Sequence, residues 1–190
     1  MHSWSPLAVL NGRIRCLAVA AGLILAVLGQ CQSLRAQPAV VDENALKLAF
    51  IFNFITFTEW PARNTAESDI RLCALGGEAL GGALNALDGR VANTRIIQVK
   101  RVSTVNEAQQ CDLLFIDPMG GRVPAPFLGE LGDSPVLTVS DAENFAKSGG
   151  MIGLLKRNNR IAFEINLATA TRAGLRFSAK LLNLAIVVPQ

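Results

Sequence analysis

Short apolar segments that alternate with helical patterns constrain this chain more than any other feature of its 190-residue sequence. The segments expected to form strands are residues 69–75, 95–99, 112–116 and 135–139. The helices expected between them are residues 78–87 and 127–131. Strands that alternate with helices are typical of βαβ units, in which the strands lie parallel. The pattern therefore predicts a sheet with a parallel part.

The segment before these strands, residues 42–60, is expected to be a helix. Asp42 can cap its first turn, and Pro61 follows its last residue. Its apolar residues occupy more than one face, and they are Leu46, Phe50, Phe52, Phe54, Ile55 and Phe57. A helix with so wide an apolar surface is expected to be covered on two sides.

After residue 139 the pattern changes to two neighbouring apolar strands, at residues 151–156 and 160–166. Asn158 and Asn159 join them, and asparagine tolerates the left-handed backbone of a tight hairpin turn. The chain is then expected to close with two helices, at residues 167–173 and 178–184. The fold class expected is α/β: a single domain with a mixed, partly parallel sheet, helices on both faces and a C-terminal antiparallel hairpin.

The first 36 residues have the features of a cleaved secretory signal. Arg13 and Arg15 precede an apolar run at residues 16–28, and small and polar residues lead to Ala36. The run has about 13 residues, fewer than the roughly 20 that span a bilayer, so no direct membrane span is expected. Cleavage after Gly29 and cleavage after Ala36 both remain open.

Removal of residues 1–36 would leave a periplasmic domain at residues 37–190 with balanced charge. The chain has 18 basic and 15 acidic residues, and the signal contains three basic residues and no acidic one. A domain without excess positive charge, outside the cytoplasm, is not expected to bind nucleic acid. The signal also contains His2, which is the only histidine.

Without a histidine, the domain has no imidazole for a catalytic triad or a zinc site. The carboxylates of Asp141 and Glu143 are better explained by capping of a helix start. Ser178 and Lys180 are two residues apart on an expected helix, so they face different directions. No enzymatic activity, no metal and no cofactor is expected.

A glycine-rich stretch at residues 76–82 follows an expected strand and opens an expected helix, as nucleotide-binding loops do. It has no lysine after Gly81, and it lacks the G-x-G-x-x-G spacing. A simple tight turn is expected here, and an anion held at the helix start at Gly77 is the alternative.

Two cysteines remain in the domain, Cys73 within an expected strand and Cys111 at the start of another. In an oxidising compartment they are expected to pair as a structural disulfide. In the chain-entropy model, a closed loop of this size would stabilise the fold by about 4 kcal/mol. A redox-active pair is the alternative, although such thiols usually lie close in sequence at a helix start.

Five motifs occur in order along the chain. They are Phe52-Asn53-Phe54 leading to Glu59-Trp60-Pro61, Leu72-Cys73-Ala74-Leu75-Gly76, Cys111-Asp112-Leu113-Leu114-Phe115-Ile116, Phe163-Glu164-Ile165-Asn166-Leu167 and Gly174-Leu175-Arg176-Phe177-Ser178. The set covers about residues 45–186 and resembles the YfiR family of periplasmic proteins. Five ordered motifs are far more specific than any one of them alone.

This resemblance implies a function that composition cannot indicate. Proteins similar to YfiR have no known enzymatic activity, and they bind the periplasmic domain of an inner-membrane diguanylate cyclase, YfiN, and hold it inactive. An OmpA-type outer-membrane lipoprotein, YfiB, sequesters YfiR and relieves the block. The resemblance thus implies a periplasmic repressor that lowers cyclic-di-GMP and biofilm formation.

The resemblance also implies roles for individual residues. The family's cysteine pair falls on Cys73 and Cys111, and a second bridge found in the C-terminal half of some members is absent here. The candidates for the partner surface are Glu164, Asn166, Arg172 and Arg176, with Trp60 and Arg63 as a second patch. The structural alternatives are an outward strand residue at Glu164, a helix cap at Asn166, solvated arginines and a core position for Trp60.

A periplasmic sensor of small ligands is the alternative function. Its pocket would lie near the helix starts at Gly77 and Asn166, and Arg176 would hold a carboxylate or phosphate. The apolar end of the chain, residues 181–188, could serve a homodimer as easily as a core.

Overall fold

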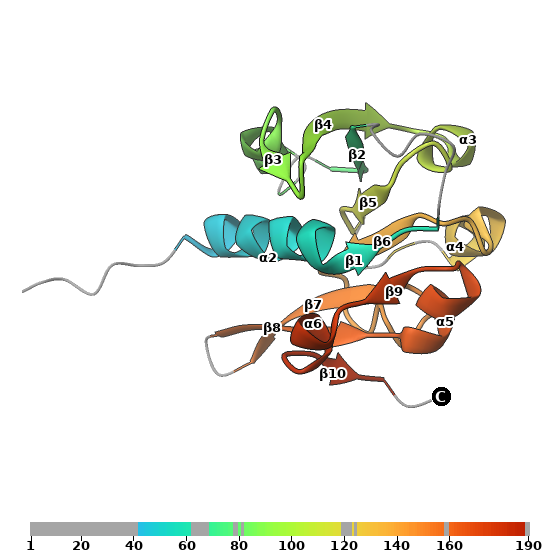
Figure 1. Cartoon of the computed structure of the whole chain (residues 1–190). Coiled ribbons are helices and arrows are strands. Elements are labelled where there is room, and N and C mark those ends of the chain that lie inside the picture. Colours follow the sequence, from blue (N-terminus) through green and yellow to red (C-terminus); the bar gives the residue numbers. More distant parts are fainter. Residues whose placement is uncertain are drawn as a thin grey trace, which may run out of the picture. The chain divides into compact units, whose positions relative to one another are not determined.

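An eight-stranded mixed sheet organises the domain (Figure 1), and its strand order is β10-β8-β7-β6-β5-β2-β4-β3. The structure is a computed structural model, and it describes residues 42–61, 69–77, 80, 82–118, 123, 125–157 and 160–188. All of these residues belong to one compact unit, Val41–Gln190. The expected signal at residues 1–36, the Asn158 and Asn159 turn, and Arg63 lie outside the described residues.

The strands of this sheet are β2 (Ile70–Leu75), β3 (Val91–Ala92), β4 (Arg95–Val102), β5 (Leu113–Ile116), β6 (Leu137–Ser140), β7 (Ile152–Arg157), β8 (Arg160–Ile165) and β10 (Ile186–Val187). Parallel pairing joins β4, β2, β5, β6 and β7. Strand β8 is antiparallel to β7, and β3 is antiparallel to β4. The expected mixed α/β sheet with a C-terminal antiparallel pair is confirmed.

The winding of the chain reverses between β2 and β5. From β2 the chain passes to β4 on one side, and it then returns to β5 on the other side of β2. Strands β6 and β7 continue in that second direction. In open parallel sheets, ligands bind in the crevice at the carboxyl ends of the two strands where the order reverses.

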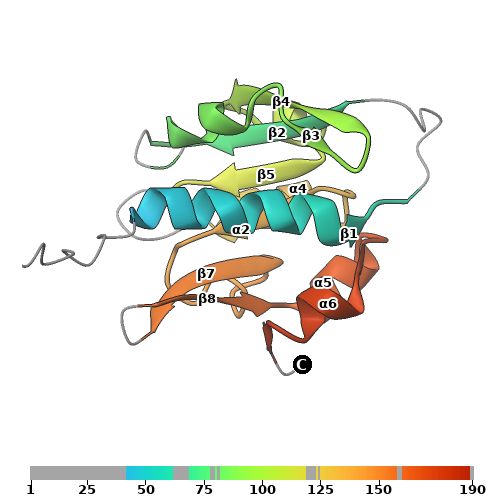
Figure 2. The ribbon, with the colours of Figure 1, turned by 60° about the vertical axis from the view of Figure 1, so that its left-hand side comes forward.

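Helix α2 (Glu43–Phe57) lies across one face of the sheet (Figure 2). The side chain of Asp42 caps it as expected, accepting a hydrogen bond of 3.0 Å from the backbone N–H of Asn44. Ile51 and Phe54 are fully buried, and the Phe54 ring meets the ring of Phe163 in β8 edge to face, with 5.0 Å between centroids. Burial of these rings anchors the helix to the sheet.

The helix ends at Phe57 and not at residue 60. Thr58 and Glu59 form strand β1 (Thr58–Glu59), which pairs antiparallel with β9 (Arg176–Phe177) in a separate two-stranded sheet. A strand of two residues has no periodicity of its own, so its distant partner defines it.

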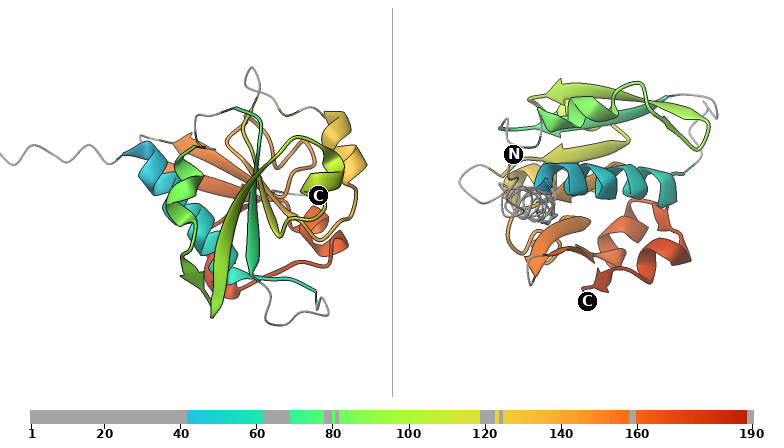
Figure 3. Two further views of the ribbon diagram at one scale, coloured as in Figure 1. Left: turned by 90° about the horizontal axis from the view of Figure 1, so that it is seen from above. Right: turned by 90° about the vertical axis from the view of Figure 1, so that its left-hand side faces the viewer.

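The other helices are short, and they are η1 (Ala83–Leu87), α3 (Val105–Ala108), α4 (Ala125–Leu131), α5 (Leu167–Arg172) and α6 (Ala179–Leu182). Helix α2 contacts η1 and α6 on one face of the sheet, and α3 packs against α4 on the other face (Figure 3). In its described part, the helix expected at residues 78–87 is only the 3-10 turn η1. Within the part of the chain that the structure describes, no helix is long and apolar enough to cross a membrane.

The disulfide expected between Cys73 and Cys111 is present, with the two Cα atoms 6.0 Å apart. It links β2 to the residue two positions before β5. Both cysteines are buried in the apolar cluster under α3 and α4. A disulfide enclosed in such a core is a structural cross-link.

Candidate functional site

The carboxyl ends of the parallel strands gather polar residues from separate elements. Asp117 follows β5, Asp141 follows β6, and Lys156 lies near the end of β7. The first turns of α2, which contain Glu43 and Lys47, contact the same edge of the sheet. Parallel strands end together, so the fold brings Glu43 to Lys156 although 113 positions separate them in the sequence.

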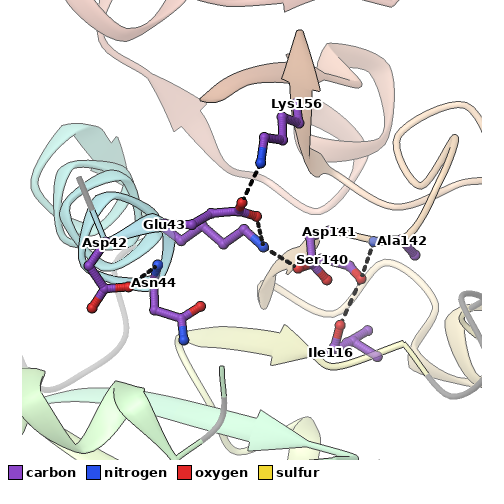
Figure 4. A network of polar contacts seen from close by, with 9 residues as sticks. Asp42, Glu43, Asn44, Ile116, Ser140, Asp141, Ala142 and Lys156 are labelled. Atoms are coloured by element: carbon purple, nitrogen blue, oxygen red, sulfur yellow. Dashed lines mark hydrogen bonds and ion pairs between the residues drawn. The ribbon is translucent and has the colours of Figure 1, made fainter. Parts of the chain in front are cut away.

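A chain of ion pairs joins α2 to the ends of β6 and β7 (Figure 4). Lys47 Nζ lies 2.7 Å from Asp141 Oδ2 and 3.0 Å from Glu43 Oε1. Glu43 Oε2 also accepts a hydrogen bond of 2.8 Å from Lys156 Nζ. Because the Lys47 side chain is only 13% exposed, its ammonium group is held between carboxylates with little water around it.

Two pKa values reflect this network. Burial disfavours the charged form of Lys47, but its hydrogen bonds to Asp141 and Glu43 outweigh burial and raise the pKa of Lys47. Hydrogen bonds from Lys156 and Lys47 lower the pKa of Glu43. Both shifts favour the charged forms near neutral pH, so the network is a set of fixed charges that orients α2.

Asp141 is not the helix cap that the sequence predicts. The segment after β6 forms turns instead of a helix, and Asp141 pairs with Lys47. Ser140 fixes the start of this segment, because its Oγ donates to the carbonyl of Ile116 at 2.7 Å and accepts from the N–H of Ala142 at 3.1 Å. The end of β6 is thus fastened to β5 and, through Asp141, to α2.

A cleft of about 440 Å³ opens beside the network. Its walls are the first turns of α2, the turns after β6, and strands β7 and β8. Charged side chains of both signs line it, and they are Glu43, Lys47, Asp141, Glu143, Lys147, Lys156, Arg157 and Glu164. A lining of balanced charge suits a polar partner or a ligand with both signs of charge better than a polyanion.

Glu164 is part of this cleft and is not a solvated outward residue. It is only 8% exposed in β8, and its Oε1 lies 3.9 Å from Lys147 Nζ. The Lys147 side chain is 54% exposed. Glu164 therefore holds a lysine whose ammonium group is presented at the surface.

Asn166 is a helix cap, as the structural alternative predicts. Its Oδ1 accepts from the N–H of Thr169 at 3.0 Å, and its Nδ2 donates to the carbonyl of Ala146 at 2.9 Å. With Arg172 and Lys147, it lines a second cleft of about 570 Å³. The cap thus contributes to a surface as well as to the helix.

Three of the four C-terminal candidates therefore lie around Lys147. We call Lys147, Glu164, Asn166 and Arg172 the α5 face. Arg172 is exposed on it, and its Nε lies 3.6 Å from Asp133 Oδ1. An exposed ion pair of this length contributes little to stability, so the arginine is available to a partner.

Arg176 and Trp60 form a separate patch beyond the C-terminal end of α5. Arg176 in β9 pairs with Glu59 in β1 at 3.0 Å, and its side chain is 82% exposed. Trp60 is half-buried, and its Nε1 donates to the carbonyl of Asp112 at 2.9 Å, just before β5 begins. Trp60 is therefore partly a core residue, as the structural alternative predicts.

The two helix starts near which the alternative ligand pocket is expected, at Gly77 and Asn166, do not lie together. Strands β5, β6 and β7 lie between β2, which leads to Gly77, and β8, which leads to Asn166. Arg176 belongs to the β1–β9 pair and pairs with Glu59. A Cβ atom on Gly77 would lie 3.3 Å from Asp117 Oδ2, and this carboxylate disfavours the anion considered there as an alternative.

The three lysines of the cleft beside α2, which are Lys47, Lys147 and Lys156, were not singled out from the sequence. Lys47 is the only charged residue between Asn44 and Thr58, in an otherwise apolar helix. A lone charge in such a helix needs a partner when it is buried, and this is the signal that could have identified it. Among the described residues, no group of three or more His, Cys, Asp or Glu side chains could hold a metal ion.

Comparisons with known proteins find a matching family model and a partly similar solved structure. Residues 44–186 match the model of the family DUF4154, described as YfiR/HmsC-like. A solved structure, the ABC domain in complex with L-Trp from Streptococcus pneumonia, is similar to 63% of this chain, with 10% identity and a TM-score of 0.42. The matched part is 55% of that structure's chain, so this likeness is partial and indicates nothing about function.

Proposed function

The chain belongs to the YfiR/HmsC-like family, and from this premise we propose that it represses a YfiN-like diguanylate cyclase of the inner membrane by binding the periplasmic domain of that enzyme. The family points to periplasmic regulation of cyclic-di-GMP signalling through a protein partner, without catalysis by the regulator. The observation that carries the proposal is the family match, which spans α2, the eight-stranded sheet and the α5 face.

Repression requires a difference in affinity between two states of the cyclase. The chain must bind the inactive state more tightly than the active state, and a 100-fold preference corresponds to about 2.7 kcal/mol. A YfiB-like lipoprotein of the outer membrane would relieve the block by mass action, because it competes for the repressor. Relief would raise cyclic-di-GMP and promote biofilm formation.

The α5 face is the surface that supports this role best. The side chains of Lys147 and Arg172 are 54% and 59% exposed, and the carboxylate of Glu164 lies 3.9 Å from the ammonium group of Lys147. Arginine is enriched at interfaces, and a basic surface is complementary to an acidic one on the partner. The Trp60 and Arg176 patch is the second candidate.

The function can be tested by measuring cellular cyclic-di-GMP in strains with the gene deleted, restored, and restored without residues 1–36. A rise on deletion that only the gene with residues 1–36 reverses is expected for periplasmic repression of a cyclase. No rise on deletion would overturn the proposal. Reversal by the gene without residues 1–36 would contradict action from the periplasm.

Two exposed arginines allow a matched test of the surface. We expect Arg172→Glu to weaken pull-down of the cyclase's periplasmic domain at least about tenfold, and Arg176→Glu to leave it unchanged. Both side chains are exposed, so neither change should lower the melting temperature by more than about 2 °C. The reverse result would assign the partner to the Trp60 and Arg176 patch. Reversal of Glu164 is less informative, because that residue is buried.

A small-ligand sensor is the second candidate function, and the cleft beside α2 favours it. Its volume of about 440 Å³ and its lining of both signs of charge suit a small zwitterion. Thermal-shift measurements against amino acids and nucleotides test this function. A concentration-dependent rise in melting temperature would support it, and the absence of any rise would remove it.

A further inference from the structure

Asp117 is a buried carboxylate at the carboxyl end of β5. It is only 9% exposed, and its backbone N–H donates to the carbonyl of Leu75, the last residue of β2, at 2.8 Å. Its Oδ2 has less than 1 Å² of accessible surface and has no hydrogen-bond partner among the described residues. Native proteins rarely leave a buried polar atom without a partner, so this oxygen calls for an explanation.

The two glycines after β2 shape the space next to this carboxylate. Gly76 has a φ of +98°, and a Cβ there would lie 2.7 Å from the carbonyl oxygen of Asp117. Gly77 is exposed, and a Cβ on it would lie 3.3 Å from Asp117 Oδ2. Only glycine fits at residue 76, and Gly77, which has no side chain, lies directly against Oδ2.

The position in the sheet is the one where this type of fold binds ligands. Asp117 follows β5 and Gly76 follows β2, and the winding of the chain reverses between these two strands. The parallel register that pairs Leu75 with Ile116 places Gly76 and Asp117 next to each other at the strand ends. The glycines and the carboxylate therefore meet at the carboxyl ends of β2 and β5, where the winding of the chain reverses.

The charge of the site selects the ligand class. A buried carboxylate oxygen repels anions and requires an N–H donor or a cation. Lys47, which lies near the end of β6, is already held by Asp141 and Glu43. Among the described residues no cluster of three acidic, histidine or cysteine side chains offers the ligands of a metal site. An ammonium group supplies both the charge and the donors.

We propose that Asp117, with Gly76 and Gly77, binds the primary ammonium group of a small ligand at the carboxyl ends of β2 and β5. The site is distinct from the α5 face and from the cleft beside α2. It stands whether or not the chain represses a cyclase, because it rests on the geometry of these three residues alone.

The test is a ¹⁵N–¹H correlation titration of the protein purified after expression of the full-length gene, with methylammonium chloride as the probe. A saturable shift of the Gly76 and Gly77 amide signals is expected. Asp117→Asn should weaken the binding at least about tenfold, since it removes a charge-assisted hydrogen bond. Gly77→Ala should also weaken it, because the new methyl group crowds Oδ2 at 3.3 Å. The control is Gly129→Ala in α4, where an added Cβ meets nothing within 4 Å.

Several results would overturn the proposal. Tetramethylammonium has the charge without N–H donors, and equal binding of it would show that only charge is sensed. Unchanged affinity in Asp117→Asn, or no saturable shift with methylammonium, would remove the site. An Asp117-dependent shift with calcium chloride in place of methylammonium would assign the carboxylate to a metal ion.

Discussion

One aspartate lies at each end of β5, and the two carboxylates differ in their hydrogen bonding. Asp112, just before the strand, is 3% exposed, and its Oδ2 accepts a hydrogen bond of 2.8 Å from the backbone N–H of Arg71. Asp117, just after the strand, is 9% exposed and has an Oδ2 with no hydrogen-bond partner in the described part of the chain. At similar burial, Asp112 therefore fastens the fold, whereas Asp117 keeps one oxygen unpaired.

Other groups add to this asymmetry. The start of β5 is also held by the disulfide of Cys111 and by the Trp60 indole, which donates to the Asp112 carbonyl at 2.9 Å. At the other end, Asp117 lies against glycines. The comparison teaches that one end of a strand can keep a carboxylate oxygen unpaired when the other end is firmly fixed.

The largest expected effect comes from the covalent link at the start of β5. The double variant Cys73→Ala with Cys111→Ala should lose up to about 4 kcal/mol of unfolding free energy in the chain-entropy model. Urea denaturation of the oxidised wild type and of the variant measures the difference. Equal free energies would show that the noncovalent contacts alone hold this end of the strand.

The second effect concerns Asp112 itself. Asp112→Ala should cost about 2–3 kcal/mol, because it leaves the N–H of Arg71 without its acceptor and removes a buried charge partner of the guanidinium. Urea denaturation checks this value. The control is Asp133→Ala, an exposed aspartate whose loss should change the free energy by less than about 0.5 kcal/mol. Equal effects of the two variants would remove the special role of Asp112.

In contrast to Asp112, substitution of Asp117 should not lower the free energy of unfolding. Asp117→Asn is expected to leave stability unchanged or to raise it by up to about 1 kcal/mol, since a buried carboxylate oxygen without a partner is unfavourable. Urea denaturation in a buffer free of amines measures this change in unfolding free energy. A loss of more than about 1 kcal/mol would mean that Asp117 is built into the fold as Asp112 is.

The smallest effect is the acid sensitivity of the network at the carboxyl ends of the strands. Hydrogen bonds from Lys156 and Lys47 lower the pKa of Glu43 below its ordinary value of 4.5. A lowered pKa in the folded state adds stability above pH 4.5, and this stability is lost as the pH falls through the folded value. Glu43→Gln should therefore flatten the fall of the melting temperature between about pH 5 and pH 3. Parallel curves for the wild type and the variant would contradict this linkage.

The main elements could be predicted from the sequence because each has its own periodicity and punctuation. Helix α2, capped by Asp42, the antiparallel pair β7 and β8, and the parallel strands all appear near their expected places. Strands β1, β3, β9 and β10 were not predicted, since two residues have no pattern and depend on a partner strand.

The candidate site was predicted only in part. Glu164, Asn166 and Arg172 were named through a family resemblance, and the structure places them around Lys147. The pair between Lys47 and Asp141 was missed, because it joins a helix to a strand end 94 positions away. The alternative of an anion near Gly77 did not take account of Asp117, because no local pattern connects this residue to a loop 40 residues earlier.

By itself the sequence determined the α/β class, the order of the main elements and the disulfide, because these follow from apolar periodicity, turn residues and the number of cysteines. It could not separate the two aspartates in the segment Asp112-Leu113-Leu114-Phe115-Ile116-Asp117, which flank one apolar strand symmetrically. Only the tertiary structure decided that Asp112 is bonded by Arg71 and that the Oδ2 of Asp117 points toward a glycine. The physical reason is that a buried carboxylate is satisfied or left open by the neighbours that other strands bring to it.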